Sequence, residues 1–213
     1  MRASLLNKLF QHVLSISATH GIDESHGMMH AMNTLHFARE LFNSERTYRP
    51  NLREHEDVIY TSAIMHDMCD KKYMDEETGF EQFKPLLISE LAPDDVDAIE
   101  KIVKTMSYSK VKENGFPYMG AYQSAYHIVR EADLLGAYDF DRSMIYHLHN
   151  TTPDIEQAFQ NACEIFDNRV LKHNDDELFV TESGRRMSLQ LHQLSLIRRA
   201  SWQELLSGKR RKL

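Results

Sequence analysis

The sequence predicts an all-α protein, and two observations support this. Apolar residues recur at spacings of three and four along nearly the whole chain, and no segment shows the alternation of a strand. Only 8 glycines and 5 prolines interrupt the 213 residues. With 42% hydrophobic residues, the chain can fill one core, so we expect residues 1–213 to form a single domain. Its parts would be a core at about 20–150, C-terminal helices at about 151–206 and a basic tail at 207–213.

Helical periodicity divides the chain into nine expected helices. Asp23 is expected to cap the second of them, and Thr152 with Pro153 to open the eighth. Two polar segments, 70–79 and 107–120, are expected to be loops. The helices are expected at roughly 2–19, 24–44, 52–69, 79–91, 94–107, 119–132, 134–150, 154–171 and 183–206, with ends uncertain by about two to four residues.

Composition and charge exclude several classes of function. The net charge of −7 argues against a nucleic-acid-binding surface. No apolar run approaches the roughly 20 residues that span a membrane. The segment 1–17 is basic and then apolar, but polar residues interrupt it, so we expect an amphipathic helix rather than a signal peptide. Two cysteines cannot build a disulfide framework, so we expect a cytoplasmic protein.

One cluster of polar residues stands out against the apolar background. His66 and Asp67 end a hydrophobic run, and Asp70 lies four residues after His66, on the same side of a helix. His30 and Asp133 lie on two other expected helices, Asp133 between apolar neighbours. Carboxylates and imidazoles that gather in this way are costly unless a cation joins them. The alternative for His66 and Asp67 alone is a polar pair at a helix end.

Taken in order on separate helices, these residues resemble the metal-binding pattern of the HD-domain phosphohydrolase superfamily. The chain is most similar to a branch of small bacterial-type proteins that includes nucleotide pyrophosphohydrolases. That branch often has the pattern HDxxDxK followed by an aromatic residue, and this chain has HDMCDKKY at 66–73. The segments SYSK (107–110) and TESG (181–184) also look like segments of the branch.

The chain departs from the branch at two places. The segment HGMMHAMN (26–33) lacks an Asp and an Arg that commonly accompany the first ligand. The segment EADLLG (131–136) lacks the Arg and the final Asp of the last motif. All four ligand positions are kept, so the departures concern the groups that orient the ligands and contact the substrate.

The resemblance implies an HD-domain fold that binds one divalent metal ion per chain. The metal ligands would be His30, His66, Asp67 and Asp133. This mixed nitrogen and oxygen set favours Mn²⁺, while Fe²⁺, Co²⁺, Ni²⁺, Mg²⁺ and Zn²⁺ are possible.

The implied function is hydrolysis of a small phosphorylated substrate, with a nucleotide favoured. Our specific prediction is cleavage of a nucleoside triphosphate to a monophosphate and pyrophosphate, by a monomer or homodimer. Asp70 would accept a proton from the attacking water, and Asp75 would assist. The predicted substrate-binding residues are His26, Lys71, Lys72, Lys110 and Arg142.

Several alternatives stay open. Asp70 could face solvent, Lys71 and Lys72 could favour a helix C-terminus through its dipole, and His26 could be a surface histidine. A degenerate HD domain would bind a nucleotide or a partner without turnover. A di-iron HD oxygenase would need two further histidines between residues 68 and 132, where the chain has only His127, about 600° around a helix from Asp133.

Overall fold

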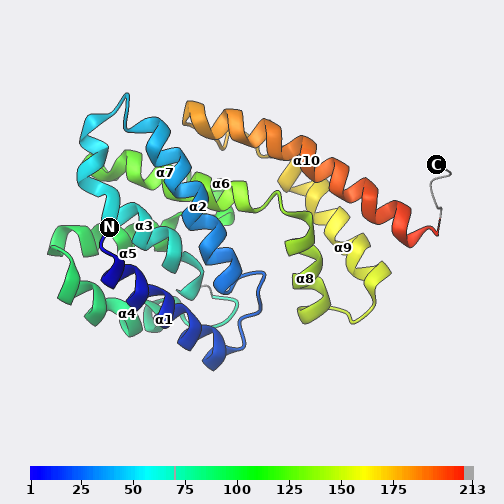
Figure 1. Cartoon of the computed structure of the whole chain (residues 1–213), viewed down its shortest axis with the longest axis horizontal. Helices are drawn as coiled ribbons and strands as arrows, with labels where there is room; N and C mark the ends of the chain where they lie inside the picture. The colour runs from blue at the N-terminus through cyan, green and yellow to red at the C-terminus, as the bar shows by residue number, and fades with distance from the viewer. Residues whose placement is uncertain (70, 209–213) are drawn as a thin grey trace. The chain divides into compact units, whose positions relative to one another are not determined.

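The computed structural model describes residues 1–69 and 71–208, with the backbone alone at position 76. The described residues form ten α-helices and four short 3₁₀ helices and contain no strand, which confirms the all-α class. Contacts divide the chain into two compact units, Met1–Leu134 and Leu135–Leu213 (Figure 1). This division falls before residue 150, where the sequence suggested that the core ends.

The first unit contains seven α-helices and three 3₁₀ helices. Its α-helices are α1 (Ala3–His20), α2 (Met28–Glu45), α3 (Glu56–Met65), α4 (Glu76–Glu90), α5 (Pro93–Thr105), α6 (Tyr108–Asn114) and α7 (Gln123–Gly136), the last ending just past the boundary. Its 3₁₀ helices are η1 (Pro50–His55), η2 (His66–Cys69) and η3 (Gly120–Tyr122). The second unit contains α8 (Phe140–Asn150), α9 (Ile155–Asn168), η4 (Val170–Lys172) and α10 (Glu182–Leu206).

Helix α3 is the centre of the first unit. Every residue from Val58 to Met65 is buried, and the helix packs against α1, α2 and α5 (Figure 1). A helix that is buried on all sides is held by the core rather than by one amphipathic face. The chain leaves α3 directly into η2, so the core fixes the position of His66 and Asp67.

The start of α2 differs from the prediction. Asp23 does not cap this helix, which begins at Met28 after Gly27. Instead, the Asp23 carboxylate accepts a hydrogen bond from the backbone N–H of Ser25 at 2.8 Å, which stabilises a local turn. Gly27 has a packing reason, because a Cβ at this position would lie 3.0 Å from the Asp23 carbonyl oxygen.

Three further boundaries in the first unit differ from the prediction. The expected loop at 107–120 contains helix α6, a short polar helix without a long apolar stripe. The expected helix at 52–69 is three elements, η1, α3 and η2. Helix α4 begins at Glu76 rather than 79, and its Gly79 packs on η2: a Cβ there would lie 3.0 Å from the Cα of Cys69.

Caps define the helices of the second unit. Helix α8 begins at Phe140 rather than 134, because the Asp139 carboxylate accepts hydrogen bonds from the backbone N–H groups of Asp141 and Arg142. Helix α9 is capped by Asp154, not by Thr152 and Pro153. Helix α10 begins one residue before its expected start and is capped by Thr181. Helices α8, α9 and α10 pack on one another.

Across the part of the chain that the structure describes, no helix is both long enough and apolar enough to cross a membrane.

Burial in the first unit predicts a large difference between two isoleucines on neighbouring helices. Ile99 on α5 is 0% exposed, whereas Ile88 on α4 is 63% exposed. Ile99→Ala should lower the free energy of unfolding by about 2–5 kcal/mol, because it removes buried methyl groups and leaves a cavity. The matched control Ile88→Ala should change it by less than about 0.5 kcal/mol. Urea unfolding followed by circular dichroism measures both, and equal losses would contradict the assigned packing.

Candidate metal centre

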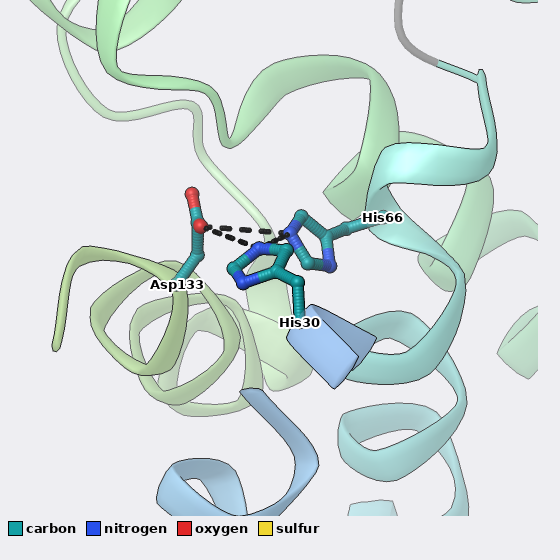
Figure 2. Close-up of side chains that lie close together, drawn as sticks. All are labelled: His30, His66 and Asp133. Carbon is teal, nitrogen blue, oxygen red and sulfur yellow. Dashed lines mark hydrogen bonds and ion pairs between the residues drawn. The ribbon is translucent and has the colours of Figure 1, made fainter. Parts of the chain in front are cut away.

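Three side chains from separate helical segments point toward one another in the first unit. His30 comes from the first turn of α2, His66 from the end of α3, and Asp133 from α7 (Figure 2). The two Nε2 atoms of His30 and His66 lie 3.1 Å apart. Oδ1 of Asp133 lies 3.3 Å from Nε2 of His30 and 3.5 Å from Nε2 of His66.

Asp67 adds a fourth group beside the two imidazoles. Its Oδ2 lies 3.2 Å from Nε2 of His30, and its Oδ1 lies 3.4 Å from Nε2 of His66. The two imidazoles therefore each face both carboxylates. All four predicted metal ligands lie together.

The spacing of these atoms suits a metal ion. Metal–ligand bonds of roughly 2.0–2.2 Å at octahedral or tetrahedral angles place neighbouring ligand atoms roughly 2.8–3.6 Å apart. The five distances above fall between 3.1 and 3.5 Å. In the described residues, His30, His66 and Asp133 are the one group of three or more His, Cys, Asp or Glu residues whose ligand atoms all lie within 4.8 Å of one another.

A backbone contact orients the His66 ring. Its Nδ1 donates to the carbonyl oxygen of Ala63 at 2.9 Å, one turn earlier in α3. Nε2 is thereby directed at the other three groups. A hydrogen bond from the second ring nitrogen to a carbonyl is the usual way in which a protein fixes a histidine ligand.

The electrostatics of the cluster also favour a cation. Burial alone would lower the pKa of His66, but the charge of Asp67 and the hydrogen bond and charge of Asp133 raise it to about 9. The pKa of Asp133 lies well below its usual value: burial opposes this, and the hydrogen bonds with His30 and His66 outweigh it. The pKa of Asp67 is also lowered, since the charge of His66 overcomes burial. The two carboxylates thus hold positive charge between them, as either protons or a metal ion.

Of the predicted substrate-binding residues, His26 and Lys72 lie together beside the metal cluster. Nζ of Lys72 is 3.3 Å from Nε2 of His26, and the ring of His26 is 6.2 Å from that of His30. The Tyr73 hydroxyl lies 3.2 Å from Nδ1 of His26. Tyr73 was part of the quoted motif, but the sequence alone gave it no role. Lys71 is exposed.

The remaining predicted residues are distributed elsewhere. Asp70 lies outside the described residues. Lys110 donates from Nζ to the carbonyl oxygen of Lys104 at 2.7 Å, at the end of α5. Arg142 belongs to the second unit, in the first turn of α8, and its contact with a substrate stays a prediction.

Asp75 has a structural role that the sequence analysis did not assign. Its exposed carboxylate caps α4 by accepting hydrogen bonds from the backbone N–H and the hydroxyl of Thr78, each at 2.9 Å. The backbone hydrogen bond is the main reason that the pKa of Asp75 is lowered. A catalytic role for Asp75 must therefore be separated from its role as a cap.

Comparison with known proteins shows the fold and goes no further. The structure resembles the crystal structure of a Lactobacillus plantarum protein that was solved as a structural genomics target. The TM-score is 0.65 and the sequence identity 20%, over 95% of this chain and 98% of that one. No family model and no curated protein matches the chain, so the resemblance to HD-domain hydrolases rests on the residues described above.

The cap at Asp75 predicts different effects of two substitutions. Asp75→Ala should lower the free energy of unfolding measurably, because the N–H of Thr78 loses its acceptor. Asp75→Asn should be nearly neutral, because Asn caps helices about as well as Asp. Chemical denaturation measures both changes. Any loss of activity in the Asn variant would then report a need for the charge itself, while equal destabilisation by Asn and Ala would contradict the cap.

Proposed function

We propose that this protein is a divalent-metal-dependent phosphohydrolase that acts on a small phosphorylated substrate, with a nucleoside triphosphate as the favoured one. The reaction would add water across the bond between the α- and β-phosphates and release a monophosphate and pyrophosphate. The observation that carries the proposal is the convergence of His30, His66 and Asp133 with ligand-like spacing. Asp67 lies beside both imidazoles as the proposed fourth ligand.

The ligand set fits the proposed metal chemistry. Two imidazole nitrogens and two carboxylates suit Mn²⁺ and its neighbours in the first transition row. An ion bound here would lower the pKa of a water molecule and neutralise charge on a phosphoryl group. The chain's own contribution would be to hold the four ligands rigidly at the end of the buried helix α3.

Other residues would handle the proton and the phosphates. Asp70 follows the ligands in the sequence, and we propose that it accepts the proton of the attacking water. Lys72 would hold the outer phosphates through its ammonium group, with His26 and Tyr73 beside it. A cation on this side would stabilise a pyrophosphate leaving group as its charge develops.

Two rival functions make different demands on the site. A di-iron oxygenase would require more histidine ligands. The candidate for one of them, His127, contacts Gln123 and the ring of Phe116. A binding module without turnover would keep the metal ligands and lose catalysis, and assays of hydrolysis separate it from an enzyme.

Metal binding should depend on the four ligands and not on histidines elsewhere. His66→Ala and Asp133→Ala should each reduce bound Mn²⁺ by at least tenfold while keeping the helical circular dichroism signal, because the cluster is local. Inductively coupled plasma mass spectrometry of protein reconstituted with Mn²⁺ measures the content. His36→Ala is the control, since His36 is exposed on the same helix as His30. Full metal content in the His66 and Asp133 variants would contradict their assignment as metal ligands.

Product analysis and two lysine variants test which phosphate bond is hydrolysed. With Mn²⁺, a nucleoside triphosphate should yield monophosphate and pyrophosphate, resolved by anion exchange. Lys72→Ala should lower kcat/KM for triphosphates by about tenfold or more, and much less for monophosphates, because only the former carry outer phosphates. Lys71→Ala is the matched neighbour and should have a smaller effect. Release of inorganic phosphate alone would leave a general phosphohydrolase in place of a pyrophosphohydrolase.

A further inference from the structure

Arg130 is a buried cation whose hydrogen-bonding capacity is largely unused. It lies on α7, one turn before Asp133, and its side chain is 2% exposed. Nη2 lies 3.4 Å from Oε1 of Glu131, which is long for a charge-assisted hydrogen bond. Among the described residues, Nε and Nη1 of Arg130 have no hydrogen-bond partner. Buried N–H donors without an acceptor are rare in native proteins, so these donors indicate that a ligand supplies the missing acceptor.

His127 offers a third buried donor, and its neighbours determine which nitrogen carries the proton. The backbone N–H of Met119 donates to Oε1 of Gln123 at 2.9 Å, which fixes the orientation of that amide. Nε2 of Gln123 then faces Nε2 of His127 at 3.1 Å and can only donate to it. In the neutral ring the proton therefore sits on Nδ1, which is buried and lacks a partner in the described part of the chain.

One aromatic ring lies against both groups. The ring of Phe116 stacks on the guanidinium, with the Arg130 Cζ 4.6 Å from its centroid, and meets the ring of His127 edge-on at 5.1 Å. Phe116 is 42% exposed whereas Arg130 and His127 are buried, so the ring lies between these donors and solvent. Its loop is bounded by Gly115 and Gly120, whose φ values of 72° and 55° are ones that glycine adopts without strain.

Two arginines act on the charge state of His127. Burial, followed by the charges of Arg130 and Arg49, lowers its pKa to about 4, so the ring is neutral near pH 7. Arg49 lies close by, with its Nη1 3.5 Å from the hydroxyl of Ser124 on α7. This environment favours an anion and opposes a second cation.

We propose that Arg130 and His127 form an oxyanion-binding site beneath Phe116 that holds a phosphate group. The edges of a guanidinium that match two phosphate oxygens pair Nη2 with Nε or with Nη1. In Arg130 the Nε and Nη1 donors of these edges have no partner among the described residues, and Nη2 makes only the long contact with Glu131. The Nδ1–H of His127 supplies a further donor. Phe116 covers the site when it is empty and moves aside when the anion enters.

The position of this site connects it with the metal centre. Arg130 and Asp133 are three residues apart on α7, so their Cβ atoms lie roughly 5–6 Å apart on adjoining parts of the helix surface. The anion is then a second phosphate of the substrate whose scissile group lies at the metal ligands. This identification rests on the proposed function, whereas anion binding by Arg130 and His127 does not.

The test uses inorganic phosphate as the probe and the full-length protein freed of metal by a chelator. Isothermal titration calorimetry should show phosphate binding to the wild type, and phosphate should raise its Tm. Arg130→Met should weaken binding at least tenfold and abolish the rise in Tm. Without phosphate its Tm should be unchanged or higher, because an apolar side chain of similar length replaces an underused buried charge. A structural role would instead lower Tm with and without phosphate. Arg53→Gln, at an exposed arginine of η1, is the control and should bind as the wild type does.

Further variants keep the proposal falsifiable. If Arg130→Met does not fold, Arg130→Lys retains the charge but loses the planar fork, and it should bind phosphate several-fold more weakly. Phe116→Ala should bind phosphate at least threefold more tightly, because no ring has to move. His30→Ala should lose metal but keep phosphate binding in chelator, so failures of the metal proposal and of the anion site give different results. Equal phosphate affinity in the wild type and the Arg130 variants, or no binding to the wild type, would overturn the site.

Discussion

The first unit is organised around a charge requirement: two carboxylates and two imidazoles meet at the end of a buried helix. Asp67 and Asp133 each face Nε2 of both His30 and His66 at 3.2–3.5 Å. Without positive charge among them, these carboxylates would repel each other in a poorly solvated place. The two carboxylates raise the pKa of His66 against the effect of burial, so the cluster favours positive charge. A proton satisfies that demand in part, and a divalent ion would satisfy it fully.

The surrounding packing keeps these groups in place. Helix α3 is buried along its last eight residues, and η2 continues from it without a break. The packing of the core therefore holds His66 and Asp67 in position. Two glycines allow the close approaches that this requires, Gly27 against the Asp23 carbonyl before α2 and Gly79 against the Cα of Cys69 beside η2. Neither position has room for a Cβ without a shift of backbone. The site is therefore built on helix ends that the core already fixes.

Sequence reasoning predicted the helices from short-range periodicity. The resemblance to an ordered motif selected four side chains that the structure brings together, and their role as metal ligands stays a proposal. Sequence reasoning failed where local and tertiary hydrogen bonds compete. Asp23 looked like a helix cap but closes its own turn with Ser25. The cap that Asp75 forms on α4 was not foreseen, while the catalytic role of Asp75 stays a prediction. Helix α6 was missed because it is short and polar. The unused donors of Arg130 and His127 could not be predicted, since periodicity does not show which buried polar atoms lack partners.

Helix α7 presents opposite needs one turn apart. Asp133 adds negative charge to the cluster, which then requires a cation. Arg130 is a buried positive charge, and the nearest oxygen of its ion-pair partner Glu131 lies 3.4 Å away. Asp133 and Arg130 do not satisfy each other through any direct pair, although their charges act on one another. A metal ion at Asp133 and a phosphate at Arg130 would meet both needs. A substrate with more than one phosphate supplies such an arrangement, because one phosphate can lie at the metal while the next lies at the guanidinium. The proposed substrate class and the proposed anion site at the buried arginine thus make use of the same distribution of charge.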